Sequence, residues 1–252
     1  MKNVSVARGE AIVLHDLSLR IGPQEHIAIL GPNGCGKSTL IRTLTCQTYP
    51  LAREESHLRI FGRERWDVSE LRRHLGVVAS ELPGERTPHT SGRDVVISGF
   101  FSSSTVWPHL HVTPQMEERA EEILHLLEIE HLRSKPVGQM SAGEAKRILI
   151  GRALVHRPQI LLLDEPSNAL DIAAQWELRH TLRRLAQQGT GILLVTHHLS
   201  DILPEIDRVV MMRNGRIVAD GSKAEMLTAP RLRDLFGVDV ELGERNGFYH
   251  AR

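Results

Sequence analysis

The stretch from Gly31 to Thr39 has the residue types and the spacing of a phosphate-binding loop of the form G-x-x-x-x-G-K-[ST]. The loop consists of Gly31, Pro32, Asn33, Gly34, Cys35, Gly36, Lys37, Ser38 and Thr39. Its glycines allow consecutive backbone N–H groups to point toward an anion. In such a loop Lys37 reaches the β- and γ-phosphates, and the hydroxyl of Ser38 binds Mg²⁺. We therefore predict that the chain binds a nucleoside triphosphate.

The segments on either side of the loop are those that a phosphate site needs. The apolar run Ile27–Leu30 predicts a buried strand before the loop, and Thr39–Leu44 predicts the opening of a helix after it. The unpaired N–H groups at that helix start add the positive end of the helix dipole. The alternative is a glycine turn that binds no ligand, but this alternative does not explain why a buried strand precedes the loop and a helix follows it.

Two carboxylates follow a second apolar run, Ile160–Leu163. Ligands in open α/β sheets bind at the carboxyl ends of the strands. We therefore expect Asp164 to hold Mg²⁺, directly or through a water. Glu165 is then left to orient and polarise the water that attacks the γ-phosphate. The alternative is an acidic strand end whose charge is satisfied by the cap of a neighbouring helix.

Two further stretches acquire meaning only beside the phosphate loop. Ser141 and Glu144 have the spacing of a capping box that opens a helix over Ala145–Leu154. With Gly143 the start of that helix stays uncovered and positive, and so able to hold phosphate. His197 follows the predicted strand Gly191–Thr196, where its tunable charge could sense the γ-phosphate. The alternatives without a binding role are that Ser141 and Glu144 only cap the helix, and that His197, one of 14 histidines, follows the strand by chance.

Length and composition limit the classes of protein. A chain of 252 residues with 41% hydrophobic and 25% charged residues fits one large α/β domain. Its formal net charge of zero argues against a nucleic-acid partner. Two cysteines, Cys35 and Cys46, provide no disulfide framework and suit a reducing cytosol. No apolar run approaches ~18 residues, so we expect any link to a membrane to come through a partner.

Periodicity and turn residues predict the remaining elements. The expected elements are a β meander over 4–21, strands over 58–61 and 76–79, a helix or strand around 95–97, helices from 113 and over 176–187, and a hairpin over 207–218 that turns at Asn214-Gly215. The tail from Pro230 carries no motif that indicates a structure.

The order of these motifs resembles that of the ATP-binding cassette (ABC) ATPases. The phosphate loop matches Walker A, Ser141–Glu144 the signature motif, Asp164-Glu165 Walker B, Ser167–Asp171 the D-loop and His197 the switch histidine. Walker A alone is shared by many nucleotide-binding proteins, whereas a signature-type helix start shortly before Walker B is specific to cassettes. The resemblance covers the chain from about Val4 to about Leu227.

The resemblance implies a fold, an activity and a partner. The fold is α/β, a P-loop core of mostly parallel strands and flanking helices with an antiparallel β subdomain and a helical subdomain. The expected bounds are 1–80 and 158–228 for the nucleotide-binding core with its β subdomain, 81–157 for the helical subdomain and 229–252 for the tail. Two cassettes pack head to tail in this family. Ser141 and Gly143 of one copy are thus expected at the γ-phosphate held by Lys37 of the other.

The function implied is hydrolysis of MgATP by a homodimer, or by a pair with a related cassette. The expected role is the ATPase subunit of a transporter whose membrane-spanning partner is a separate chain. Its expected location is the cytoplasm, at the inner face of the membrane through that partner. The alternative is a soluble cassette that acts on a complex without transport. A P-loop kinase of a small molecule does not explain the signature helix or the D-loop.

Three positions depart from the family pattern. Ser80 stands where the Q-loop glutamine is expected, which puts Mg²⁺ contact and coupling to a partner in doubt and favours the alternative without transport. Arg8 stands at the adenine-stacking aromatic position, where it either stacks on the base or is solvated. Glu144 replaces the commoner glutamine of the signature. Together with Ser80, the stretch Val95–Phe101 is similar to a bacterial subgroup associated by name with molybdate uptake, and this similarity names no substrate.

Overall fold

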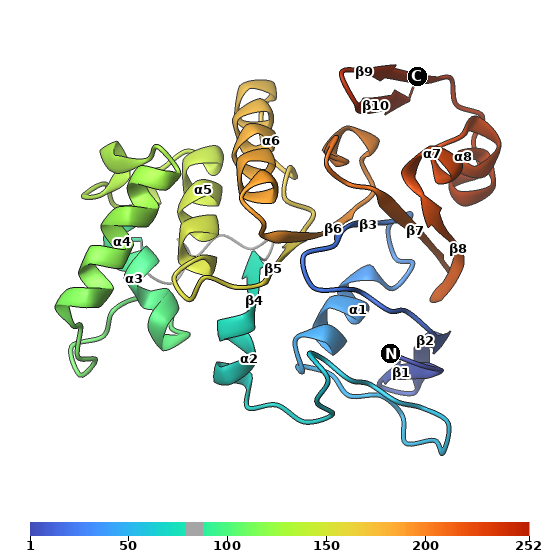
Figure 1. Ribbon diagram of the computed structural model, residues 1–252, viewed down its shortest axis with the longest axis horizontal. Helices are drawn as coiled ribbons and strands as arrows, with labels where there is room; N and C mark the ends of the chain where they lie inside the picture. The colour runs from blue at the N-terminus through green and yellow to red at the C-terminus, as the bar shows by residue number, and fades with distance from the viewer. Residues whose placement is uncertain (79–87, 252) are drawn as a thin grey trace. The chain divides into compact units, whose positions relative to one another are not determined.

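The computed structural model describes residues 1–78 and 88–251 (Figure 1). The chain divides into two compact units. Unit 1 comprises Met1–Leu71 and Gly191–Arg252, and unit 2 comprises Arg72–Thr190. The division falls inside helix α2 (Val68–His74). Ser80 lies outside the described residues, so its predicted role at the Q-loop position stays a prediction.

The core of unit 1 is a sheet in which the strands follow the order β6-β3-β7-β8. The four strands are β3 (His26–Leu30), β6 (Gly191–Thr196), β7 (Arg208–Arg213) and β8 (Arg216–Ser222). β3 runs parallel to β6 and to β7, so that Ile27 lies opposite Leu193 on one side and Arg208 on the other. Every residue of β6 is buried, as expected for a parallel strand covered on both faces.

Smaller elements of unit 1 surround this sheet. They are strands β1 (Val4–Arg8) and β2 (Ala11–Leu17), helices α1 (Lys37–Leu44), α7 (Lys223–Met226) and α8 (Ala229–Phe236), the 3₁₀ turn η5 (Leu199–Asp201), and strands β9 (Leu242–Arg245) and β10 (Phe248–Ala251). β1 and β2 form one antiparallel hairpin, and β9 and β10 form another. α1 begins within the phosphate loop at Lys37, two residues before the predicted helix start at Thr39.

Unit 2 combines a parallel pair of strands with a group of helices. Its elements are β4 (Leu75–Val78), β5 (Ile160–Asp164), α3 (Gly92–Ser98), α4 (Pro114–Leu126), α5 (Ala142–Ala153), α6 (Ile172–Gln187) and the 3₁₀ turns η2 (Gly99–Phe101), η3 (Glu130–Leu132) and η4 (Val137–Gln139). Helices α3, α4 and α5 pack against one another (Figure 1). Thr113 caps α4 by accepting a hydrogen bond from the Met116 amide at 3.4 Å.

Three sequence predictions differ from the structure. The predicted strand at Leu58–Phe61 is wrong, because only isolated bridges form there, between Lys2 and His57 and between Ile60 and Arg63. α6 begins at Ile172, four residues before the predicted start, since Asp171 caps it there. The tail from Pro230, in which we found no motif, continues α8 and forms the β9–β10 hairpin.

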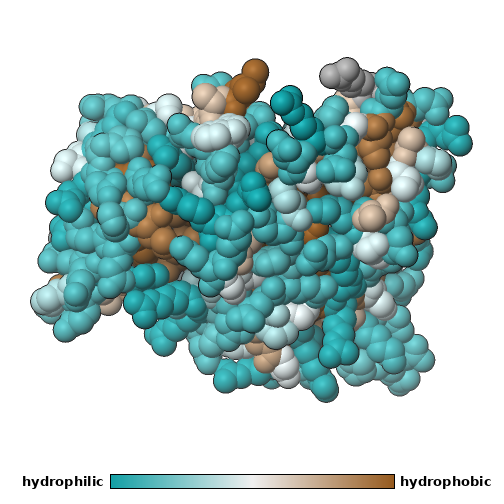
Figure 2. All heavy atoms as spheres, turned by 45° about the horizontal axis from the view of Figure 1, so that its top comes forward, coloured by the Kyte–Doolittle hydropathy of each residue, from teal (hydrophilic) through white to brown (hydrophobic). Residues whose placement is uncertain are grey.

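The surface is mostly hydrophilic on the face drawn in Figure 2, with hydrophobic side chains in separate small patches. Ile172 and Trp176 are large hydrophobic side chains with high exposure, at 88% and 60%. Of the helices in the described part of the chain, none is long and apolar enough to cross a bilayer.

We predict that Gly99→Ala destabilises the helical part of unit 2. Gly99 ends α3 with an ordinary φ of −58°, so alanine adds no backbone strain. An added Cβ, however, overlaps the carbonyl oxygen of Arg152 and lies 2.9 Å from Val155 Cγ2. Overpacking of this kind costs about 1–3 kcal/mol. We expect that loss in the free energy of unfolding measured by urea denaturation.

The control is Gly22→Ala, since the atom nearest to an added Cβ at that position is 3.4 Å away. Equal stability of the Gly99→Ala and Gly22→Ala variants would show that α3 and α5 do not pack as closely as described.

Candidate functional site

The phosphate loop in unit 1 has a backbone that requires glycine at several positions. Gly34 and Gly36 have positive φ angles of 77° and 106°. At Gly31 a Cβ would overlap the carbonyl oxygen of Met212 and lie 2.7 Å from Cys35 Sγ. Side chains rarely adopt these conformations or fit these contacts. The backbone course of the loop therefore depends on these glycines, and the binding of an anion by the loop stays a prediction.

Lys37 and the start of α1 bring positive charge to the phosphate loop. Lys37 is only 7% exposed, and its ammonium group donates to the carbonyl oxygens of Gly31 at 2.8 Å and Pro32 at 3.1 Å. Gly36 is the N-cap of α1 and provides no side-chain cap, and the first turn contains no acidic residue. The amides at the helix start thus keep their capacity for a phosphate ligand.

The other predicted nucleotide-binding residues of unit 1 are further residues of the loop and Arg8 of strand β1. Ser38 is exposed in the first turn of α1, and Thr39 beside it is buried. Cys35 is 4% exposed, which favours a space-filling role for its side chain over oxidation. Arg8 is exposed at the end of β1, opposite Ala11. Its position is compatible with both alternatives, stacking on a base and solvation.

A turn far away in the sequence braces the phosphate loop. The amide of Gly215 donates to the carbonyl oxygen of Cys35 at 2.9 Å, and its own carbonyl accepts from the amide of His15 at 2.8 Å. Gly215 has φ 70°, and a Cβ there would overlap the carbonyl oxygen of Val13. The sequence predicts the Asn214-Gly215 turn but gives no signal that it contacts the loop.

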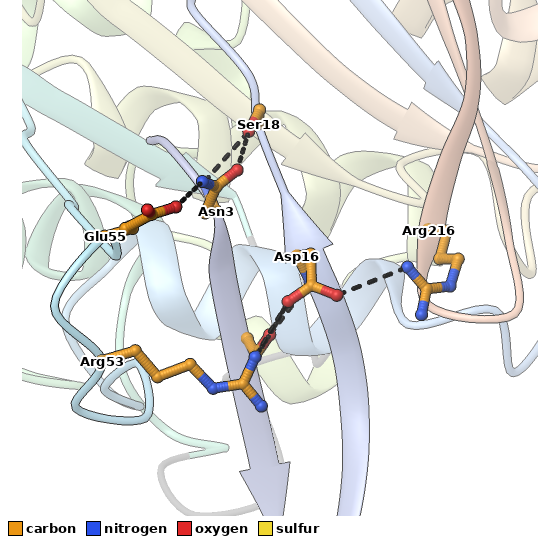
Figure 3. Close-up of polar contacts among 7 residues, drawn as sticks. Asn3, Asp16, Ser18, Arg53, Glu55 and Arg216 are labelled. Carbon is orange, nitrogen blue, oxygen red and sulfur yellow. Dashed lines mark hydrogen bonds and ion pairs between the residues drawn. The ribbon is translucent and has the colours of Figure 1, made fainter.

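A polar cluster holds the neighbouring residue Arg216 and the strand β2 (Figure 3). Asp16 accepts from Arg53 at 2.9 Å on one carboxylate oxygen and pairs with Arg216 at 3.5 Å on the other. The hydrogen bond from Ser5 lowers the pKa of Asp16, and the two arginines act in the same direction against a smaller effect of burial. These side chains are about half exposed, so each ion pair is screened by solvent and contributes little to stability.

In unit 2, Asp164 and Glu165 stand at the carboxyl end of β5, as predicted. Both residues are half-buried. Glu165 has a φ of 45°, in the left-handed region that a non-glycine residue occupies at a cost. Its carbonyl accepts the amide of Asn168 at 3.2 Å. Strain of this kind is common at functional sites, where it fixes the direction of a side chain.

The D-loop continues from these carboxylates into α6. Ser167 is buried, and Ala169 has a positive φ of 63°. Asp171 ends the loop as the N-cap of α6, where its carboxylate accepts from the Ala174 amide at 2.8 Å.

The capping box predicted at the start of α5 is present. The amide of Glu144 donates to Ser141 Oγ at 3.2 Å, and the amide of Ser141 donates to Glu144 Oε2 at 2.7 Å. Lys135 pairs with the same carboxylate at 2.8 Å. Burial alone raises the pKa of Glu144, but Lys135 and the Ser141 amide lower it further than burial raises it. Lys135 and the Ser141 amide thus compensate the negative charge of Glu144.

Gly143 has a second role that the sequence does not show. A Cβ at this position would lie 2.7 Å from Ala174 Cβ, so the glycine allows α6 to approach the first turn of α5. We expected this glycine only to leave the helix start uncovered. Ser141 beside it is exposed.

Lys146 is a further candidate for the functional site, and the sequence did not point to it. It lies on α5 and is 3% exposed. Burial lowers its pKa, and the charge of Asp164 opposes that shift. Its position on the buried face of α5 was the available signal, because lysines are rarely buried so completely.

His197 follows the last residue of β6 in unit 1, as predicted, and is half-buried. Its ring stacks on that of His198, with centroids 3.8 Å apart and planes tilted by 40°. The described residues contain no group of three or more His, Cys, Asp or Glu side chains arranged to hold a metal ion.

Comparison with known proteins identifies relatives of the whole chain. The family model described as "ABC transporter" matches residues 14–168. The hemin import ATP-binding protein HmuV of Plesiomonas shigelloides is 30% identical, with 96% of this chain and 95% of that protein covered. The phosphonates import ATP-binding protein PhnC 2 of Nostoc sp. is 34% identical, with 83% and 86% covered.

A solved structure extends the comparison to an assembly. A dimeric ATP-binding cassette in a post-hydrolysis state, bound to ADP and Pi, has a TM-score of 0.70 and 26% identity. The match covers 88% of this chain and 97% of that one. These likenesses confirm the predicted fold class, a P-loop α/β core with antiparallel and helical parts.

We predict that Gly215→Ala weakens nucleotide binding, although Gly215 is outside the phosphate loop. Its Cβ overlaps Val13, so the turn must move and its hydrogen bond to Cys35 is strained or lost. We expect the dissociation constant for ATP, measured by calorimetry, to rise by about tenfold, the equivalent of one hydrogen bond.

The matched control is Asn214→Gly, which keeps the left-handed turn, since Asn214 has φ 49°. An unchanged affinity in the Gly215→Ala variant would mean that the loop does not depend on this brace.

Proposed function

The chain belongs to the ABC transporter family, and from this premise we propose that Gly31–Thr39 binds the triphosphate of ATP. The observation that carries the proposal is the loop itself. Its backbone turns through positive φ at Gly34 and Gly36, α1 begins without a side-chain cap, and a buried lysine lies over the loop carbonyls. A triphosphate supplies the negative charge that this arrangement accepts.

The chain is an ATP-binding and ATP-hydrolysing subunit that pairs with a second cassette and energises transport through a membrane partner. The two relatives are named for hemin and for phosphonates, so their names give no common substrate. We place the chain in the cytoplasm, at the membrane through that partner. The substrate is recognised elsewhere in such an assembly, because the motifs described here concern only phosphate and water.

The residues proposed for Mg²⁺ fit that ion by their chemistry. Asp164 provides a half-buried carboxylate at a strand end, and Ser38 an exposed hydroxyl at a helix start. Mg²⁺ prefers such oxygen ligands and completes its shell with substrate phosphates and water. A Mg²⁺ ion held by Asp164 and Ser38 would neutralise negative charge on the transferred phosphoryl group.

Two residues are proposed to act during hydrolysis. Glu165 orients and polarises the attacking water, and its left-handed backbone fixes the direction of its carboxylate. His197, at the end of β6, contacts the γ-phosphate and stabilises its charge as the bond to the β-phosphate breaks. The products are ADP and inorganic phosphate.

The start of α5 is proposed to contact the nucleotide held by a second copy. Ser141 and Gly143 present a hydroxyl and a backbone amide at the positive end of the helix. Glu144 is compatible with a nearby triphosphate because Lys135 and the capping amide already neutralise its charge. Its replacement of a glutamine therefore does not argue against this contact.

We predict that Lys37→Ala abolishes ATP binding, because the lysine supplies the positive charge on the phosphates. Calorimetric titration with MgATP measures the effect. Arg42→Ala is the control, since it removes an exposed cation of the same helix outside the loop. Normal affinity in the Lys37→Ala variant would remove Lys37 from the site.

We predict that Glu165→Gln binds ATP with unchanged affinity but hydrolyses it about 10²–10⁴ times more slowly, the usual contribution of a general base. The stalled complex then accumulates as a dimer that gel filtration detects with ATP and not with ADP. The control is Glu177→Gln, a half-exposed glutamate on α6. Full turnover by the Glu165→Gln variant would assign the catalytic carboxylate to another residue.

A further inference from the structure

The turn that carries His197 is held by a side chain that precedes it. Thr196 is the last residue of β6, and its side chain is fully buried. Its hydroxyl oxygen accepts a hydrogen bond from the amide of His198 at 3.0 Å. A threonine that accepts the amide two residues ahead forms a local turn around the residue between them. That enclosed residue is His197.

Asp201 determines how the Thr196 hydroxyl is oriented. Asp201 Oδ2 accepts the hydroxyl proton of Thr196 at 3.0 Å. The two side chains are buried, with exposed fractions of 4% and 0%. With its proton committed to Asp201, the hydroxyl presents its lone pair to the His198 amide. Burial of a charged carboxylate costs free energy, and hydrogen bonds to fixed partners offset that cost. In the low-dielectric interior such hydrogen bonds are also stronger than in water.

The backbone after His197 is closed and covered within unit 1. The amide of Asp201 donates to the carbonyl oxygen of His198 at 3.2 Å, and Ile202 donates to Leu199 at 3.1 Å. β10 of the C-terminal hairpin packs on this 3₁₀ turn, η5. At Gly247, between the two strands of the hairpin, a Cβ would lie 2.9 Å from Pro204 Cβ. Asp201 therefore lies in a turn that is hydrogen-bonded within itself and packed against the hairpin, and from there it contacts Thr196.

We propose that Asp201 is a positioning residue for His197, acting through the hydroxyl of Thr196. Asp201 fixes Thr196, Thr196 fixes the amide after His197, and the imidazole is thereby kept where it meets the terminal phosphate. The inference rests on the proposed function in one respect, the role of His197 in hydrolysis. It adds a residue that the motif order does not indicate, since Asp201 is four positions beyond the switch histidine.

The first test measures the turn without nucleotide. Hydrogen exchange of the peptide that contains His197 and His198 is followed by mass spectrometry in the full-length chain. We expect Asp201→Ala and Thr196→Val to increase the exchange rate about tenfold, while Asp201→Asn and Thr196→Ser, which keep a hydrogen-bonding oxygen, restore most of the protection. Thermal melts and ATP binding identify any variant that does not fold. Unchanged exchange in folded Asp201→Ala and Thr196→Val would overturn the proposal.

The second test separates positioning from general stability. We expect Asp201→Ala to lower kcat by tenfold or more with KM changed less than twofold, because small misplacements of a catalytic group cost up to about 10² in rate. In the double variant with His197→Ala, the loss should equal that of His197→Ala alone. Multiplied losses would show that Asp201 acts independently of His197, and the proposal would fail.

The outcomes also separate this inference from the proposed function. Full turnover by His197→Ala would remove His197 from hydrolysis, and the positioning role would fail with it. Loss of turnover in His197→Ala together with normal kcat in Asp201→Ala would leave the proposed function intact and reject only the inference about Asp201.

Discussion

The left-handed backbone at Gly34 and Gly36 is the constraint on which the rest of unit 1 depends. A helix that starts from a left-handed glycine has no side chain to cap its first amides, so those amides remain directed at the loop. The loop can keep this shape only if the strand before it is held in place. β3 meets this need, because it is hydrogen-bonded to β6 on one side and β7 on the other. Lys37 completes the arrangement with a buried charge.

Unit 2 obtains its chemistry from the ends of elements in the same way. β5 ends in two carboxylates, and the second of them occupies a strained backbone conformation. α5 begins with an exposed serine and a glutamate whose charge is neutralised within its own first turn and by Lys135. In both cases a regular element fixes the backbone, and its terminal residue presents the polar group. The regular parts of these elements supply burial and hydrogen bonds but no chemistry.

Local spacing was enough to predict the loop, its flanking strand and helix, and the capping box of α5, because the interactions of each lie within a few residues. Contacts between distant segments were not predictable. The Gly215 brace and the approach of α6 to Gly143 both depend on tertiary packing. The strand expected at Leu58–Phe61 failed for the same reason, since its alternating pattern found no partner strand. The hairpin of the tail has two strands of four residues, and its β10 packs on η5, a segment about 50 residues earlier in the chain.

The contacts that hold the phosphate loop from outside have two parts, and these differ in how well they tolerate substitution. The outer part consists of two half-exposed ion pairs of Asp16, with Arg53 and with Arg216. Each contributes little, so one can be lost while the other persists. The inner part is a single buried glycine with a positive φ, for which no other amino acid is an adequate substitute. Replacement of one charged residue around Asp16 should therefore change the position of the phosphate loop little, whereas a side chain at position 215 should displace it.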